Sequence, residues 1–296
     1  MAQMIQTYLK YIAHEKRYSE HTISSYENDL LQLQVFLSSF GFENPLLEAK
    51  HKILRAWIVS LVEDKISPRS INRKIATLRS FYKFLLIREM IDTNPTIQLK
   101  PLKTDKPLPE FIQEREMVNL LDNIQFSDDF HGWRDKLILE LFYGTGIRLS
   151  ELIGIKNESI NEGQNTVKVL GKRNKERVIP ISLNIVDIIR TYNAKKVEAF
   201  GELSIPNLLV TDKGDKCYPM MVNRTVKKYL GYITKSSKKS PHVLRHTYAT
   251  HLLNKGADLN AVKDLLGHSS LAATQVYTHN SLKKLKSVFE KAHPKA

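Results

Sequence analysis

The segment from Ser240 to His251 concentrates side chains that could bind a phosphate and act on it. Ser240-Pro241 is typical of a helix start, because a capping hydroxyl precedes a proline that has no amide hydrogen to satisfy. His242 and Arg245 then lie three residues apart, on nearly the same face of the predicted first turn. Free amide groups at a helix N-terminus favour anions. A guanidinium adds a bidentate fork for phosphate oxygens and an imidazole can move a proton, so the segment predicts a phosphate-binding site.

Two other interpretations of this segment compete. His242 and His246 have the four-residue spacing of metal ligands on a helix, but the glutamate of the His-Glu-x-x-His pattern is absent between them. The residues could also be structural polar groups at a helix end. In isolation, the segment favours that structural interpretation.

Further reactive side chains are spread along the chain. Arg148 follows a glycine-flanked turn, and Lys172 lies at the tip of a predicted β-turn, from which an ammonium could reach outward. His268 comes directly after a glycine that ends a predicted helix, and Tyr277 follows nine residues later. Singly, each has an ordinary structural explanation, so their meaning depends on whether the fold gathers them.

The elements that carry these residues follow from periodicity. Alternation of period two over Thr166–Leu170 and Arg177–Ile181, around a turn at 171–175, predicts a β-hairpin. Helical spacing predicts helices near Arg134–Phe142, with a break at Gly144-Thr-Gly146, and near Arg148–Leu152, Leu183–Lys196, Pro219–Thr234, Pro241–Lys255, Asp258–Leu266 and Leu271–Tyr277.

The N-terminal third is predicted to be helical throughout. Ser19 caps a helix whose run ends at Gly41, residues 52–63 form an amphipathic stretch, and Ser67-Pro68 starts a third helix. Prolines then interrupt the chain between Asn94 and Pro109, which predicts a linker. The predicted organisation is therefore an N-terminal helical domain over residues 1–94, a linker over 95–109 and a C-terminal domain over 110–296.

The overall charge favours a polyanionic partner. The 296 residues carry a net charge of +14, and phosphates neutralised by Lys or Arg release condensed counterions. The third helix has a basic face that could follow a phosphate backbone or could simply be solvated, and the two interpretations are about equal: Arg69, Arg73, Lys74, Arg79 and Lys83.

The location is predicted to be cytoplasmic. Cys217 is the only cysteine, so a disulfide within the chain is impossible and a reducing compartment is the simplest interpretation. The first residues do not resemble a secretory signal, and no apolar run approaches the roughly 20 residues of a membrane span.

The set Arg148, Lys172, His242-x-x-Arg245, His268 and Tyr277 resembles the tyrosine recombinase (phage integrase) family. The strings Gly-Thr-Gly-Ile-Arg-Leu-Ser-Glu-Leu, His-Val-Leu-Arg-His-Thr-Tyr-Ala-Thr-His and Leu-Leu-Gly-His-Ser-Ser are most similar to bacterial Xer-type recombinases. The resemblance implies a mostly α fold with a small β-hairpin or sheet. It also implies a core-binding domain and a catalytic domain that form a clamp around DNA.

The chemistry that this resemblance implies is strand transfer without a cofactor or metal. Tyr277 would attack a backbone phosphate to form a 3′-phosphotyrosine, with His242 as the general base. Arg148 and Arg245 would hold the non-bridging oxygens, and His268 would add a hydrogen bond. The predicted proton donor to the 5′ oxygen is Lys172. The energy of the phosphodiester is retained in the phosphotyrosine, so rejoining requires no ATP.

The pattern determines the roles of the hairpin turn and of Glu151 less fully. Arg173 stands where the Xer pattern usually has glycine, which leaves both Lys172 and Lys175 open as the proton donor. Arg173 and Lys175 are also candidate DNA contacts. Glu151 is predicted to orient the catalytic cations from the same helix as Arg148.

The resemblance also implies a tetramer on two sites of double-stranded DNA. A second recombinase and a DNA translocase would assist it in resolving chromosome dimers so that chromosomes partition at cell division. The apolar stripe Leu282, Leu285, Val288 and Phe289 forms a tail helix predicted either to pack on its own domain or to dock into a neighbouring protomer.

Three alternatives stay open. An integrase of a mobile element shares the chemistry, although such proteins often carry an extra N-terminal domain and only about ten residues precede the first predicted helix here. A type IB topoisomerase would relax DNA without a specific site. A catalytically silent DNA-binding protein is disfavoured, because all the catalytic residue types are present.

Overall fold

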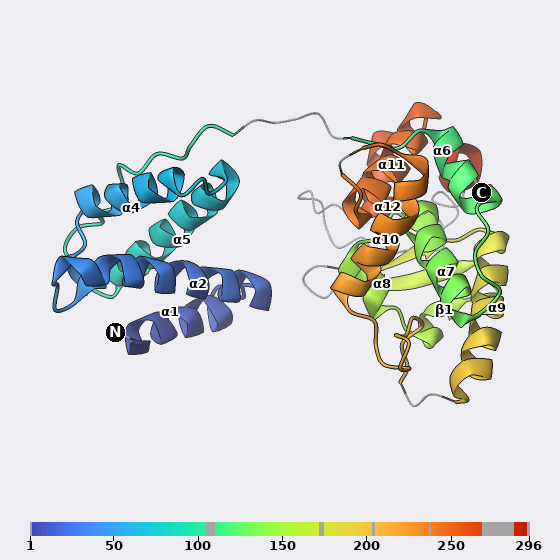
Figure 1. The fold of residues 1–296 in the computed structure, drawn as a ribbon, viewed down its shortest axis with the longest axis horizontal. Coiled ribbons are helices and arrows are strands. Elements are labelled where there is room, and N and C mark those ends of the chain that lie inside the picture. Colours follow the sequence, from blue (N-terminus) through green and yellow to red (C-terminus); the bar gives the residue numbers. More distant parts are fainter. Residues whose placement is uncertain are drawn as a thin grey trace. The chain divides into compact units, whose positions relative to one another are not determined.

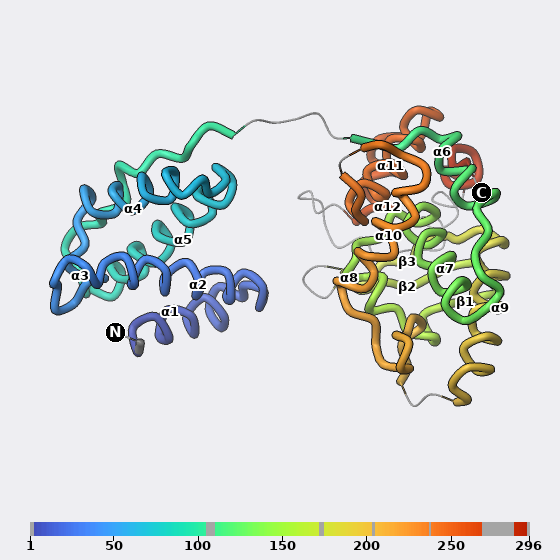
Figure 2. Tube along the Cα trace, viewed as in Figure 1, coloured from blue at the N-terminus to red at the C-terminus, as the bar shows by residue number. Residues whose placement is uncertain are grey.

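A computed structural model describes residues 2–104, 110–171, 175–202, 205–236, 238–267 and 287–294. The chain folds into two compact units, Met1–Pro107 and Leu108–Ala296, and each is described by itself (Figures 1 and 2). The described residues are mostly helical, with one three-stranded antiparallel sheet in the second unit. This confirms the predicted fold class.

The regular elements in the described part of the first unit are all helices. They are α1 (Ala2–His14), α2 (Glu20–Leu37), η1 (Ser38–Phe40), α3 (Pro45–Glu48), α4 (His51–Glu63) and α5 (Pro68–Ile87). Helix α2 packs against α1 and α5, and α4 packs against α5. The predicted starts are confirmed, because Ser19 and Ser67 each accept a hydrogen bond from a backbone amide three residues later.

Helix α1 begins at Ala2, earlier than the sequence predicts, because about ten residues are expected to precede the first helix. Ile5, Tyr8, Leu9 and Ile12 are all buried, which is the three- and four-residue spacing of an amphipathic helix. Polar residues separate these positions, so the segment resembles neither an export signal nor a continuous apolar run.

Residues 95–104, expected as part of the linker, pack on the first unit. The side-chain amide of Asn72 on α5 donates to the carbonyl of Leu102 and accepts from its amide, at 2.9 and 2.7 Å. Leu99 is buried in the core of the same unit. Backbone polar groups are thus satisfied by a side chain where no helix could satisfy them.

The second unit surrounds the sheet with helices. They are α6 (Glu114–Val118), η2 (Asn119–Asn123), α7 (Phe130–Thr145), α8 (Leu149–Gly154), η3 (Asn157–Ser159), α9 (Leu183–Phe200), α10 (Pro219–Ile233), α11 (Pro241–Asn254) and α12 (Leu259–Leu266). Residues 287–292 are also helical. Helix α7 packs against both α9 and α11.

The predicted β-hairpin is confirmed. Strand β2 (Thr166–Leu170) pairs antiparallel with β3 (Glu176–Pro180), with Thr166 opposite Pro180 and Leu170 opposite Glu176. A short strand that was not predicted, β1 (Ile160–Asn161), pairs with the other edge of β2. Two residues are too short to show a period, so the sequence gives no signal for β1.

Helix α7 runs further than predicted, from Phe130 through the expected break at Gly144 to Thr145. A Cβ at Gly144 would lie 2.5 Å from Cδ1 of Ile185 on α9, so this glycine serves close helix packing. The chain turns at Gly146 instead, in the left-handed conformation with φ of 60°. Because α7 is buried on nearly every side, its sequence shows no single apolar face.

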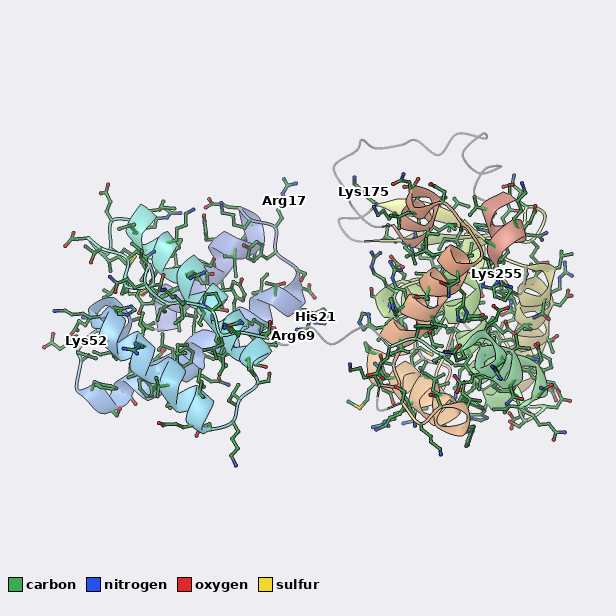
Figure 3. All side chains as sticks on the ribbon, turned by 90° about the horizontal axis from the view of Figure 1, so that it is seen from above. Arg17, His21, Lys52, Arg69, Lys175 and Lys255 are labelled. Atoms are coloured by element: carbon green, nitrogen blue, oxygen red, sulfur yellow. The ribbon has the colours of Figure 1, made fainter. Side chains whose placement is uncertain are left out.

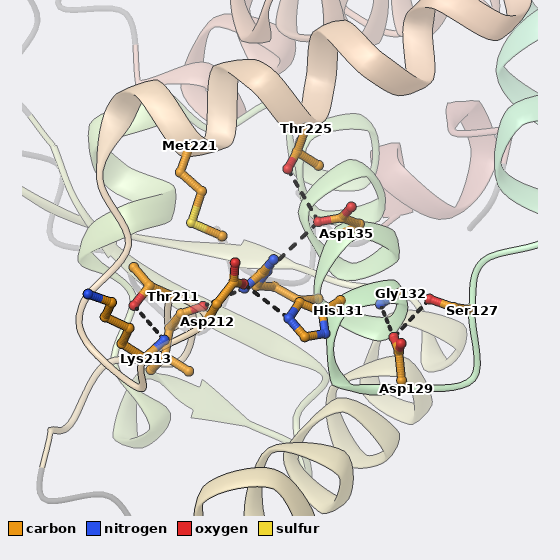
Figure 4. Close-up of polar contacts among 12 residues, drawn as sticks. Ser127, Asp129, His131, Gly132, Asp135, Thr211, Asp212, Lys213, Met221 and Thr225 are labelled. Atoms are coloured by element: carbon orange, nitrogen blue, oxygen red, sulfur yellow. Dashed lines mark hydrogen bonds and ion pairs between the residues drawn. The ribbon is translucent and has the colours of Figure 1, made fainter.

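A buried arginine, Arg134, ties α7 to the loop that precedes α10 and carries Asp212, which Figure 4 shows. Its guanidinium donates to the carbonyl of Val210 and to Asp212, and its side chain is 6% exposed. Thr225 on α10 donates to the neighbouring Asp135. This network cross-links the unit through charged hydrogen bonds.

The described part of the tail packs on its own unit. Phe289 and His293 are 3% and 6% exposed, and their rings stack with centroids 4.9 Å apart. A ring nitrogen of His293 lies 3.0 Å from the carbonyl of Tyr143 on α7. Within the described residues, no helix combines the length and apolarity needed to cross a bilayer.

Candidate active site

Arg148 and Glu151 are locked together at the start of α8. Arg148 is the N-cap residue, and its backbone amide donates to Oε2 of Glu151 at 2.7 Å. Its guanidinium donates to Oε1 of the same carboxylate at 2.8 Å. The side chain of Glu151 is 1% exposed while that of Arg148 is 32% exposed. The buried carboxylate therefore holds an arginine that still reaches the surface.

Arg245, in the first turns of α11, lies close to the pair of Arg148 and Glu151. Its guanidinium donates to the carbonyls of Gly146 and Leu266, and the residue is 9% exposed. Burial, followed by the positive charges of Arg148 and Arg177, lowers the pKa of Arg245 to about 10. At neutral pH the group is still charged, and an anion placed beside it would relieve the crowding of positive charge.

The C-terminal end of α12 brings the arginines together. The carbonyls of Leu265, Leu266 and Gly267 are consecutive, and each accepts from a different arginine: Arg177 at 3.1 Å, Arg245 at 2.6 Å and Arg148 at 3.0 Å. The last carbonyls of a helix lack partners within the helix and carry its negative dipole end. They therefore attract guanidinium groups from segments far apart in the sequence.

Arg177 completes the cluster, and the sequence had assigned it only to a strand. Its Nη1 and Nη2 donate to the two oxygens of Glu151 at 2.6 and 2.9 Å, and its side chain is 5% exposed. Alternation along β3 turns Arg177 inward together with Ile179. A charged residue at an inward strand position was the available signal, because such a charge needs a buried partner.

The cluster contains three guanidinium groups and one carboxylate. Burial alone would raise the pKa of Glu151, but the hydrogen bonds and charge of Arg177, followed by those of Arg148, outweigh it and lower the pKa to about 2. Glu151 is thus ionised at neutral pH, and the four side chains together carry two positive charges. Preorganised positive charge of this kind stabilises the charge that develops on a reacting phosphate.

Comparison with known proteins identifies the family of this chain. The Phage integrase family matches residues 110–284, and the Phage integrase, N-terminal SAM-like domain matches residues 5–89. The tyrosine recombinase XerC of Staphylococcus epidermidis is 40% identical over 303 residues, which cover 100% of this chain and 99% of that protein. The chain belongs to the phage integrase family of tyrosine recombinases. Proteins of this family cleave and rejoin DNA through a tyrosine intermediate, and so does this one.

Two solved structures have the same fold. The XerH site-specific recombinase bound to a palindromic difH substrate after cleavage aligns with a TM-score of 0.71 at 21% identity, over 90% of this chain and 78% of that one. A lambda integrase tetramer bound to a Holliday junction aligns with a TM-score of 0.68 at 17% identity, over 94% and 80%. The predicted membership of the recombinase family is confirmed.

The structure of this recombinase places some of the predicted site residues and leaves others outside its described part. Arg148, Glu151 and Arg245 gather as described above. His242 is exposed in the first turn of α11, and Lys175 is exposed beside β3, at the hairpin end (Figure 3). Lys172, Arg173, His268 and Tyr277 lie outside the described residues. Across the described ranges, no group of three or more His, Cys, Asp or Glu gathers as a metal site would.

The basic face of α5 divides into two groups. The ammonium of Lys74 is buried and donates to Asp29 and Gln32, so it is an internal group rather than a surface contact. Arg73 pairs with the same Asp29 at 2.5 Å. Arg73 is itself exposed, as are the other three, of which Arg79 also donates to the carbonyl of Leu99: Arg69, Arg79 and Lys83.

The low pKa of Glu151 predicts how acid affects the recombinase. The pKa lies at about 2 in the folded state against an ordinary 4.5, so ionised Glu151 stabilises the fold above pH 4.5, and this stability is lost as the pH falls toward 2. Glu151→Gln should destabilise the protein by about 3 kcal/mol at pH 7. Urea unfolding at pH 7 and at pH 3 should show that the gap between wild type and variant narrows in acid.

Glu162→Gln is the control for this measurement, because Glu162 forms an exposed ion pair with Arg190. Exposed pairs contribute at most about 1 kcal/mol, so this variant should unfold nearly as the wild type does. A gap for Glu151→Gln that stays constant from pH 7 to pH 3 would contradict the assignment.

Proposed function

We propose that this protein is a site-specific recombinase that exchanges DNA strands through a 3′-phosphotyrosine on Tyr277. The observation that carries the proposal is the convergence of Arg148 and Arg245 on one helix end, with a net positive charge. Both side chains belong to the motif that resembles the family, although long stretches of sequence separate them. A phosphodiester bound there would balance the net positive charge of the cluster.

The proposed reaction is an in-line transesterification. The phenolic oxygen of Tyr277 attacks phosphorus while His242 accepts its proton, since tyrosine ordinarily ionises only near pH 10. Arg148 and Arg245 bind the non-bridging oxygens, where charge accumulates, and His268 donates a further hydrogen bond. The bond from phosphorus to the 5′ oxygen breaks, and Lys172 protonates that oxygen. Lys175 is the second candidate for this proton transfer.

The proposed assembly is a tetramer that holds two DNA sites. The lambda integrase relative of the same fold was solved as a tetramer on a Holliday junction, and the XerC relative covers the whole chain. Resolution of chromosome dimers in the cytoplasm, with a second recombinase and a DNA translocase, is the biological role that we propose by analogy.

The first unit is proposed to contact the DNA backbone through α5. Arg69 and Lys83 are exposed and lie about four turns apart on this helix. If each neutralises one phosphate, changing both to alanine should lower the slope of log affinity against log salt by about 2, in addition to weakening binding. Duplex binding at several salt concentrations measures this slope.

Lys52→Ala is the matched control, because Lys52 is an exposed lysine of the same unit that lies away from Arg69 (Figure 3). Its slope should equal that of the wild type. A slope that is unchanged in the double variant, or lowered equally by Lys52→Ala, would remove α5 from the proposed interface.

Covalent capture tests the proposed function and finds the target. The protein is mixed with sheared chromosomal DNA of its source, denatured, and recovered with any attached DNA for sequencing. The expected result is one recurrent sequence joined to protein at its 3′ end, while the strand on the other side of the cut has a free 5′-hydroxyl that a kinase can label. Attachment at the 5′ end, or no adduct at all, would overturn the proposal. A site beside a mobile element would instead favour an integrase.

A further inference from the structure

Arg177 contacts Glu151 and the end of α12, the two features that hold the other arginines of the cluster in place. Its two Nη groups bind Glu151, its Nε donates to the carbonyl of Leu265, and its side chain packs against Gly267. A Cβ at Gly267 would lie 3.1 to 3.2 Å from three atoms of Arg177. No other side chain joins β3, the start of α8 and the end of α12 in this way within the described residues.

We infer that Arg177 is a positioning residue for strand cleavage, which acts through Glu151 on Arg148 and through the end of α12. The inference rests on the proposed function, because it assigns Arg177 a part in that same site. Arg177 is too buried to meet DNA itself, with a side chain 5% exposed. Its effect on the reaction must therefore pass through the groups that it holds.

The first route runs through the carboxylate. Glu151 accepts two hydrogen bonds from Arg148 and two from Arg177. Arg177 balances the charge of Glu151, so Arg148 need not turn its whole guanidinium inward to do so. Arg148 accordingly keeps a side chain that is 32% exposed and available to a phosphate.

The second route runs through two glycines. A Cβ at Gly171 would lie 3.4 Å from Oε1 of Glu151 and 3.5 Å from Nη1 of Arg177, so the buried ion pair also packs against the base of the hairpin turn. Gly267 packs against the same guanidinium and has a φ of 62°, which favours glycine. In the sequence, these two glycines directly precede Lys172 and His268. One guanidinium thus packs against both of the glycines that precede these residues in the sequence.

A purely structural role would look like that of Arg134. Arg134 is also 5% exposed, lies in the same unit, and donates to one carbonyl and one carboxylate, those of Val210 and Asp212. It makes no contact with the cluster of Arg148, Glu151 and Arg245. The two arginines therefore match in burial and in binding one carbonyl and one carboxylate, although Arg177 donates from three nitrogens and Arg134 from one. They differ in what they hold.

The test compares Arg177→Met with Arg134→Met on the duplex recovered by covalent capture. We expect Arg177→Met to slow adduct formation by roughly 10²-fold, the effect of misplacing reacting groups by about an ångström. Duplex affinity should stay within about threefold of the wild type, because phosphate contacts elsewhere dominate binding. Arg134→Met should lower thermal stability yet react within about threefold of the wild type at a temperature where both variants are folded.

The pH profile supplies a readout that a structural role would not move. Glu151 faces Arg148 from α8, Arg177 from β3 and Arg245 from α11. Loss of the hydrogen bonds and charge of Arg177 should raise the pKa of Glu151 from about 2, so protonation of Glu151 should slow adduct formation at a higher pH than in the wild type. Arg177→Lys keeps a charge beside Glu151 and should restore the wild-type profile with part of the rate. The double variant Glu151→Gln/Arg177→Met removes the titrating carboxylate, so it should react slowly and without the shift of the profile to higher pH.

The outcomes separate the two proposals. If the wild type forms no adduct, the proposed function fails. If the wild type reacts and Arg177→Met behaves like Arg134→Met, with neither a slower rate nor a pH profile shifted to higher pH, only the role of Arg177 is overturned. If Arg177→Met does not fold, Arg177→Lys and the double variant decide the question by the same two measurements.

Discussion

Replacing Tyr277 by phenylalanine should abolish the covalent protein–DNA adduct while DNA binding persists. The substitution removes only the hydroxyl oxygen that would bond to phosphorus. Loss of a nucleophile in comparable enzymes slows the reaction by roughly 10⁴ to 10⁶-fold, and here no other atom of the side chain can form the bond. A denaturing gel of protein mixed with labelled duplex measures the adduct directly, and a native gel measures binding.

The control for this experiment is a second tyrosine of the same unit. Tyr232 is 62% exposed near the end of α10, and Tyr232→Phe should form the adduct as the wild type does. An undiminished adduct with Tyr277→Phe would refute the nucleophile assignment. An adduct lost with Tyr232→Phe instead would transfer the role to that residue.

The parts of the fold that the sequence predicts are those decided by neighbouring residues. Ser19 and Ser67 cap their helices through bonds that span three residues, and the β2–β3 hairpin follows from alternation around one turn. The break predicted at Gly144 is wrong, because this glycine lets α7 pack closely against Ile185 on α9. Packing between elements overrides a local breaker when the backbones must approach closely.

The same distinction applies to the site. The residue types and spacing around His242 and Arg245 predicted a phosphate-binding helix start, and the motif predicted which distant residues belong with it. The carbonyls of Leu265, Leu266 and Gly267 have no signature in sequence, because every residue carries a carbonyl. Their role depends on where α12 ends in space, and so does the role of Arg177.

The basic face of α5 shows why charge counts alone mislead. Lys74 and Arg73 satisfy the buried Asp29, so their charges hold α5 to α2. Arg69 and Lys83 belong to the same predicted basic face as Lys74 and Arg73, and they are exposed. Only the position of an acidic partner on another helix separates the two groups.

Changing Arg245 to glutamine should slow adduct formation by roughly 10³ to 10⁵-fold, the range seen when an arginine that stabilises phosphoryl-transfer charge is removed. Arg245 spans the carbonyls of Gly146 and Leu266 and is held beside Arg148 and Arg177, so its charge is preorganised and desolvated. Glutamine can still donate to one carbonyl but supplies no charge. Single-turnover adduct formation, measured below the unfolding temperature, reports the rate.

Two further variants separate charge from geometry. Arg245→Lys keeps the charge but cannot donate to both carbonyls and a phosphate together, so its rate should fall between those of Arg245→Gln and the wild type. Arg190→Gln, at an exposed arginine paired with Glu162, should react as the wild type does. Glutamine at position 245 leaves one carbonyl poorly satisfied, at a cost of about 1 to 3 kcal/mol in stability. A rate for Arg245→Gln within tenfold of the wild type would show that the phosphate is held elsewhere. A much slower rate would not be explained by the lost stability, because the rate is measured on folded protein.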